Sequence, residues 1–315
     1  KSEPIAATIH YGAYIPDKKR VDVRYLWWLL RSNTFRDLLD QYVPGGIKTE
    51  LKAKRLSPIP VPIPSLHEQK RVLARIEQLA AKIEAVLCFR HEAIEEADAL
   101  VRAGSRRFFE KREGVEETVK LSEVSRRITK GESPEWQGFS YVDSGPVFVR
   151  SQNVLWGKID ITQPTRIPEA FHQKLLRSQL HVSDVLINLV GASIGRSCVV
   201  PDNIGDANVN QAVAVISPDP GRLDSNYLMH FLISAPTQGI IHGGKVETAR
   251  PNISLGDLRD LNLPVPPLDE QRQIVKYLDG LTVQVERLKR LQTEAAAKLD
   301  ALLPSLLNEA FKGEL

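Results

Sequence analysis

The side chains in this chain best suited to chemistry are polar and basic residues at the ends of apolar stretches. The clearest group is Arg150-Ser151-Gln152-Asn153, which follows a run of β-branched and aromatic residues. Arginine, glutamine and asparagine can make paired hydrogen bonds to base edges in the major groove of DNA. The group therefore suggests base recognition, although a solvated loop can have the same composition.

Two more groups have the composition of a nucleic-acid surface. One lies in the loop TKGESPEW, where the lysine could hold a phosphate and the tryptophan could stack on a base or belong to the core. The other lies in NVNQAVAVISP, where the amides could read bases or cap turns. From these groups we expect DNA contacts at Lys130, Ser133, Trp136, Asn208, Asn210 and Gln211.

A glycine-rich stretch, Gly191–Ser197, resembles a phosphate-binding loop only in part. It is one residue shorter than the GxxxxGK[ST] motif, has arginine in place of lysine, and leads into β-branched residues. We interpret it as a tight turn between strands. Such a turn can bring backbone N–H groups close to a DNA phosphate, with Ser193 and Arg196 beside them.

The sequence gives no support for catalysis by this chain alone. It lacks the Asn-Pro-Pro-Tyr type of signature of adenine methyltransferases, and its histidines have no metal-ligand spacing. We therefore expect no catalytic residue, no metal and no cofactor. Cys88 and Cys198 lack a CxxC spacing, which suits a reducing compartment, and we expect a cytoplasmic protein with no membrane partner.

The overall charge neither requires nor excludes a nucleic acid. The chain has 315 residues, of which 42% are hydrophobic and 26% charged, as is usual for a globular protein of two or more domains. Its net charge is +3, and between Gly114 and Asn226 acidic residues slightly outnumber basic ones. Binding to DNA must therefore depend on local basic patches.

The elements that must position these groups are duplicated. The phrase SLHEQKRVL at Ser65–Leu73 returns as PLDEQRQIV at Pro267–Val275, 202 residues later, and further identities keep the same offset. This constant offset predicts a duplicated unit. In each copy we expect a short helix (Val23–Tyr42 or Ser225–Ile241), a glycine-glycine turn, a stiff proline-rich arm and a long helix.

The apolar residues of the two expected long helices follow a spacing of alternating fours and threes. The stripe runs from Val72 to Leu100 in the first copy and from Ile274 to Leu302 in the second. A period of about 3.5 residues predicts a left-handed supercoil with a long partner, and we expect the two helices to pair antiparallel. A polar residue, Arg90 or Gln292, interrupts each stripe at the same place, which fixes register at a cost in stability.

Between the long helices the sequence changes to short β-branched stretches. VKLSEVSRRITKG predicts a strand and a short turn, and GPVFVRSQNVLWGKIDI predicts two strands around a turn. The stretches SDVLINLVGASIGRSCVV and DANVNQAVAVISP add more strands. The fold class is therefore α+β, with β-rich domains joined by two long antiparallel coiled-coil helices and an internal pseudo-twofold repeat. The expected parts are residues 1–64, the end of a first β-rich domain; 65–112, a long helix; 113–266, a second β-rich domain; and 267–315, a second long helix.

Together these parts resemble the specificity subunit of type I restriction–modification enzymes. The resemblance rests on the phrase Pro264–Gln271, its weaker copy Pro62–Gln69, the ending Phe311–Leu315, and the stretches VRSQNV and LVGASIGR. It implies two target-recognition domains that each read half of a bipartite site in double-stranded DNA. It also implies that the long helices bind two methyltransferase subunits, and that a motor-nuclease subunit joins for restriction. Only the end of the first recognition domain is recognisable, so we expect this chain to be an N-terminally truncated form.

Apolar residues outside the main stripe of the second long helix require a partner. The residues expected to dock a methyltransferase are Val275, Leu291, Leu303, Leu306, Leu307 and Phe311.

The alternative function is a non-catalytic scaffolding protein whose long helices join β-rich, protein-binding modules. Salt-dependent binding to DNA distinguishes the two hypotheses.

Overall fold

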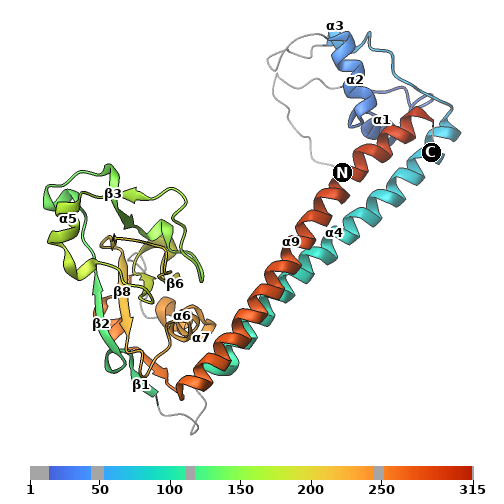
Figure 1. Cartoon of the computed structure of the whole chain (residues 1–315). Coiled ribbons are helices and arrows are strands. Elements are labelled where there is room, and N and C mark those ends of the chain that lie inside the picture. The colour runs from blue at the N-terminus through green and yellow to red at the C-terminus, as the bar shows by residue number, and fades with distance from the viewer. Residues whose placement is uncertain (1–13, 44–52, 111–117, 244–251, 314–315) are drawn as a thin grey trace. The chain divides into compact units, whose positions relative to one another are not determined.

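The computed structural model describes residues 14–43, 53–110, 118–243 and 252–313 (Figure 1). The chain divides into two compact units. The first unit comprises Lys1–Glu96 and Arg287–Leu315, and the second comprises Ala97–Glu286. Each long helix contributes residues to both units. No helix in the described ranges is long and apolar enough to cross a membrane.

The long helices α4 (Leu66–Phe109) and α9 (Leu268–Lys312) run antiparallel, as predicted (Figure 1). In the first unit, Arg90 of α4 lies opposite Gln292 of α9. In the second unit, Gly104 of α4 lies so close to Leu281 that an added Cβ would be 2.9 Å from its Cδ2 atom. Both helices continue beyond the ends of the predicted apolar stripes, through Gly104 and Pro304.

Each copy begins with two short helices where we predicted one. In the first unit the break falls at Ser32, whose hydroxyl accepts a hydrogen bond from the backbone N–H of Phe35 at 3.2 Å. Serine favours such a cap because its side chain satisfies a free N–H at the helix start. The predicted turn at Gly45-Gly46 lies outside the described residues, as does Gly244. The helices are α1 (Val23–Leu30) and α2 (Asn33–Tyr42) in the first unit, and α6 (Ser225–Ile233) and α7 (Ala235–Gly243) in the second.

A fully buried glutamine from the repeated phrase anchors the short helices to the long helix in each unit. In the first unit Gln69 Oε1 accepts from Asp22 N at 2.8 Å, and Gln69 Nε2 donates to Arg20 O at 2.8 Å and Pro64 O at 2.7 Å. The second unit repeats all three bonds 202 positions later. Gln271 Oε1 accepts from Asp224 N at 2.8 Å, and Gln271 Nε2 donates to Arg222 O at 2.8 Å and Pro266 O at 2.7 Å.

An aromatic contact is repeated in the same way. In the first unit the ring of Tyr25 meets the ring of Phe311 edge-on, with centroids 5.2 Å apart. In the second unit Tyr227 meets Phe109 with centroids 5.3 Å apart. Each short helix thus packs against the end of the long helix from the other copy. Such pairs add to the apolar area that both rings bury.

The second unit contains the β-rich part of the fold, in three small sheets (Figure 1). The four-stranded sheet has the order β2-β8-β5-β6, the three-stranded sheet β4-β3-β7, and β1 pairs with β9. All pairings are antiparallel except β3 with β7. The strands are β1 (Thr118–Lys120), β2 (Ser125–Lys130), β3 (Val142–Val149), β4 (Thr165–Arg166), β5 (Val185–Asn188), β6 (Ser197–Val199), β7 (Ala207–Val209), β8 (Val213–Pro218) and β9 (Asn262–Pro264).

Two local predictions for this part were wrong. The residues expected to form a turn after the first strand form β2, because they pair with β8 over most of its length. The second strand expected around Trp156 is only an isolated bridge between Val154 and Ile159. The remaining helices of the described ranges are α3 (Ala53–Leu56), α5 (Glu169–Lys174) and α8 (Leu255–Arg259).

The core of the second unit lies between the four-stranded sheet and the helices. Tyr227 and Leu228 of α6 pack with Ile187 of β5 and Ile216 of β8. Phe109, the last residue of α4, belongs to the same cluster. This packing fixes the sheet on the long helices, so the loops at the strand ends have a rigid support.

Candidate nucleic-acid interface

Four loop segments meet where β2, β3, β5 and β7 end. The backbone N–H of Gly131 donates to Asn210 O at 3.2 Å, and that of Asn210 donates to Val149 O at 3.0 Å. The backbone N–H of Leu189 donates to Ala212 O at 2.8 Å. These bonds bring together the four groups that the sequence singled out, and we call this place the polar junction.

The first segment follows β2. Lys130 is exposed, and the next residue must be glycine because a Cβ on Gly131 would lie 1.6 Å from the carbonyl oxygen of Val209. Trp136 is 72% exposed, which removes the possibility that it is a core residue. Ser133 is buried, so its proposed contact with DNA is not available in this structure.

The second segment follows β3 and forms a single turn of 3₁₀ helix over Ser151–Asn153. Asn153 is buried, and its Oδ1 accepts from the backbone N–H of Arg150 at 2.9 Å while its Nδ2 donates to Asp160 O at 2.9 Å. Asn153 therefore shapes the loop, and the expectation that it reads bases is corrected. Gln152 is exposed, and Arg150 and Ser151 are partly exposed.

The third segment is the glycine-rich stretch, which is a turn between β5 and β6 as predicted. Gly191 and Gly195 have φ angles of 76° and 81°, a conformation that other residues adopt only with strain. Ser193 and Arg196 are partly exposed on this turn. Strand β6 follows the stretch, whereas the phosphate loop of a nucleotide-binding protein leads into a helix.

The fourth segment joins β7 to β8, and its amides have different surroundings. Asn208 is 0% exposed, and its amide bonds with His172 Nδ1 at 2.6 Å, Leu175 O at 3.1 Å and Ser178 Oγ at 2.8 Å. Asn208 therefore holds the α5 region, and the expectation that it contacts DNA is corrected. Asn210 Oδ1 caps a turn by accepting from Ala212 N at 3.1 Å. Gln211, like Asn210, is partly exposed.

Buried polar atoms without a hydrogen-bond partner among the described residues gather at this junction. They include Arg150 Nε, Asn188 Oδ1 and Gln211 Oε1, and Gln238 Oε1 lies against the glycine-rich turn. Folded proteins pair almost all buried polar groups, so such a concentration needs an explanation. An unused donor and several unused acceptors suit a polar ligand or ordered water. Asn188 was not predicted, although a lone asparagine inside the apolar run VLINLV is a visible signal.

The polar junction carries basic side chains that are not used in ion pairs. Lys130, Arg150 and Arg196 have no ion-pair partner in the part of the chain that the structure describes. By contrast, Arg127 is bound to the buried carboxylate of Asp184 at 2.6 Å and serves the fold. Hydrogen bonds from the backbone and hydroxyl of Thr162 lower the pKa of Asp160, so this carboxylate stays charged beside the second segment.

Comparisons with known proteins bear on what such a junction is for. Residues 174–296 match the family model described as "Type I restriction modification DNA specificity domain". The EcoBI specificity subunit of Escherichia coli is 29% identical over 174 residues, a match that spans 55% of this chain and 36% of that subunit. The putative MjaX specificity subunit of Methanocaldococcus jannaschii is 22% identical over 303 residues, which span 90% of this chain and 67% of that subunit.

Two solved structures extend the likeness to nearly the whole chain. One, from a study of assembly and conformational transition of the type I R-M system, has a TM-score of 0.75, 25% identity, and coverage of 95% of this chain and 73% of that chain. The HsdS subunit from Thermoanaerobacter tengcongensis has a TM-score of 0.61, 25% identity, and coverage of 95% and 72%.

This chain is similar to type I restriction–modification specificity subunits, and the match to the family model is confined to residues 174–296.

In the described structure, most of the residues expected to dock a methyltransferase are used inside the chain. Leu307 is 3% exposed and Phe311 7% exposed, both in the core of the first unit with Tyr25. Leu303 packs against the same core, and Val275 packs against the core of the second unit. Docking at Leu307 and Phe311 is therefore corrected, because the packing of α1 already covers them. Leu306 is partly exposed, and Leu291 is 49% exposed.

The long helices expose other apolar residues, at equivalent positions of the two copies. Val86 and Phe89 of α4 are exposed, and so are Leu288 and Leu291 of α9, each 202 positions later. We call these four residues the duplicated patch, and all four belong to the first unit. Exposed large apolar side chains that recur at equivalent positions are candidates for an interaction surface. Val86 and Leu288 were expected inside the helix pair, so the pair covers only part of its own stripe.

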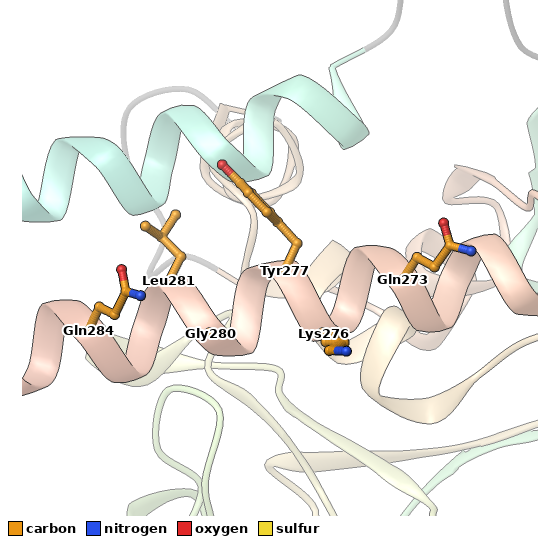
Figure 2. A pocket seen from close by; sticks show the side chains of 6 residues that line it. All are labelled: Gln273, Lys276, Tyr277, Gly280, Leu281 and Gln284. Carbon is orange, nitrogen blue, oxygen red and sulfur yellow. The ribbon is translucent and has the colours of Figure 1, made fainter.

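A separate groove of about 420 Å³ follows α9 in the second unit (Figure 2). In Figure 2 the side chains of Tyr277 and Leu281 point toward the neighbouring helix, whereas Lys276 points away. The first copy has Arg75 and Gln78 where this groove has Tyr277 and Gly280. The groove is therefore not duplicated and is distinct from the duplicated patch.

Proposed function

We propose that this chain is the sequence-specific DNA-recognition subunit of a type I restriction–modification complex. Its polar junction reads one half of a bipartite site in double-stranded DNA. The chain is not an enzyme by itself, and the chemistry is carried out by subunits that bind it. A restriction subunit with motor activity joins the full complex.

The observation that carries this proposal is the convergence of four sequence-distant polar segments at one set of strand ends. Arg150 and Gln152 offer the hydrogen-bonding groups that distinguish base pairs in the major groove. Lys130 and Arg196 supply free positive charge for phosphates, and the exposed ring of Trp136 supplies a flat apolar surface. Such a division between positioning and reading contacts is usual in protein–DNA interfaces.

The partners proposed for the long helices are two DNA adenine methyltransferase subunits. The duplicated patch supports two such subunits, because equivalent apolar residues recur on α4 and α9. Phe89 is 68% exposed and Leu291 49% exposed, which is unfavourable in water unless a partner covers them. Helices from each partner packed against this patch would bury the residues in a larger bundle.

The alternative is a non-catalytic scaffolding protein that uses the same long helices to join β-rich, protein-binding modules. The two functions differ in their response to salt. DNA binding through phosphates weakens steeply as salt rises, since bound counterions are released.

The experiment is selection of bound duplexes from a random pool by the purified complex, followed by titration at several salt concentrations. We expect enrichment of a sequence motif and affinity that falls as salt rises. If the complex enriches no motif, or if its affinity for DNA does not change with salt concentration, the scaffolding function is the better account.

A further inference from the structure

A buried asparagine, Asn188, links two segments of the polar junction. It is the last residue of β5 and is 0% exposed. Its backbone N–H donates to Arg196 O, and its backbone oxygen accepts from Gly195 N, both at 2.9 Å. Its side-chain Nδ2 donates to Ser151 O at 2.8 Å. One residue therefore holds the glycine-rich turn with its backbone and the Arg150 loop with its side chain.

The side chain of Asn188 also has an unused half. Its Oδ1 is buried without a hydrogen-bond partner among the described residues, and so is Arg150 Nε in the loop that Asn188 holds. Each buried polar atom without a hydrogen bond costs free energy of folding. A residue with a purely structural role would not be expected to carry this cost beside a second unsatisfied group. Asn208, the other fully buried asparagine of this region, has partners for both atoms of its amide.

We propose that Asn188 is a positioning residue for base recognition, an inference that rests on the proposed function. It fixes the loop that carries Arg150 and Gln152 relative to the turn that carries Arg196. A paired contact between arginine and a base depends on narrow geometry, so a loop that drifts loses discrimination between base pairs. A phosphate contact tolerates more movement, because it depends mainly on charge.

The test uses two variants, Asn188→Asp and Asn188→Ser. The first nearly keeps the shape but replaces the donor to Ser151 O by a carboxylate oxygen, and the second is too short to reach it. The complex with methyltransferase subunits selects duplexes from a random pool, at a temperature where thermal unfolding shows each variant to be folded. We expect about a tenfold loss of preference at base pairs read by the Arg150 loop in both variants. Asn188→Ser adds no charge, so its binding to random DNA and its salt slope should be unchanged.

The matched control is Asn208→Asp, a change at an equally buried asparagine whose bonds hold the α5 region. It should lower the melting temperature and leave the sequence profile of the folded protein as it is. If the wild type enriches a motif and both Asn188 variants keep that profile, the positioning role is wrong. If the wild type enriches no motif, the proposed function itself fails, so the two failures are distinguishable.

Discussion

Arg90 Nη1 donates a hydrogen bond to Gln292 Oε1 at 3.0 Å, and these two residues occupy the same position in the two copies of the repeat. A position contacts its own equivalent only where a local twofold axis passes beside it. Within the first unit, a local twofold axis that relates these segments of α4 and α9 therefore passes beside this polar interruption. The contact sets the register of the helix pair, because a shift of either helix would separate the two side chains.

This contact predicts opposite effects for single and double substitutions. Gln292→Leu alone should lower the free energy of unfolding by about 1–3 kcal/mol, because the partly buried guanidinium of Arg90 loses its partner. The double change Arg90→Leu with Gln292→Leu should restore or exceed wild-type stability, because it completes the apolar stripe. Urea unfolding measures both. A double variant less stable than the single variant would contradict this account.

Much of the framework was predictable because a repeat with constant offset constrains distant residues together. The offset identified the long helices and their polar interruption, and short β-branched apolar stretches identified β5 and β8. Side-chain direction was not predictable: Asn208 points into the α5 region because β7 pairs parallel with β3, a pairing that no local pattern encodes. Likewise, the spacing of Leu307 and Phe311 shows that they need a partner but not that α1 provides it.

The duplicated patch predicts which variants lose the methyltransferase subunits. Phe89→Ser with Leu291→Ser should abolish co-purification of both subunits, while stability changes by only about 0.5 kcal/mol per site because both residues are exposed. Phe89→Ser alone should leave a complex with one methyltransferase subunit in place of two. Mass photometry reads this stoichiometry directly.

A matched control separates docking from folding. Leu307→Ser changes a leucine buried in the core of the first unit, and should cost about 2–5 kcal/mol of stability. If the Leu307→Ser variant loses partner binding, its melting temperature should fall as well. Full-strength binding of two subunits by the double surface variant would disprove docking at the duplicated patch.

Cys88 offers an independent probe of the same surface, since it is exposed and precedes Phe89. A hydrogen bond to Glu92 raises the pKa of the Cys88 thiol, so its reactive thiolate is scarce at neutral pH and labelling should accelerate as pH rises. Docked methyltransferase should slow this labelling. Burial raises the pKa of Cys198 to about 12, so Cys198 should react only after unfolding and serves as the internal control. Labelling of Cys88 at an unchanged rate in the saturated complex would argue against docking beside Phe89.

The polar junction predicts different defects for its two kinds of cation. Arg150→Ala should cost about 1–3 kcal/mol on the preferred site and relax preference at one base pair. Lys130→Ala should weaken binding to all sequences and reduce the salt slope by about one. Lys120→Ala is the control, because that lysine is paired with Asp260 at 2.8 Å on β1, away from the junction. Identical sequence profiles and salt slopes for Arg150→Ala and Lys130→Ala would refute the division of roles.

The central claim, that this chain supplies sequence specificity to a methyltransferase, is tested most directly by mapping methylated adenines across a genome. The methyltransferase subunits are expressed with the wild-type chain, with its Arg150→Ala variant, or without it. We predict a methylated motif that contains the half-site read by this chain, requires the chain, and becomes degenerate at one base pair in the variant. A methylated motif that is the same with and without the chain would contradict the account.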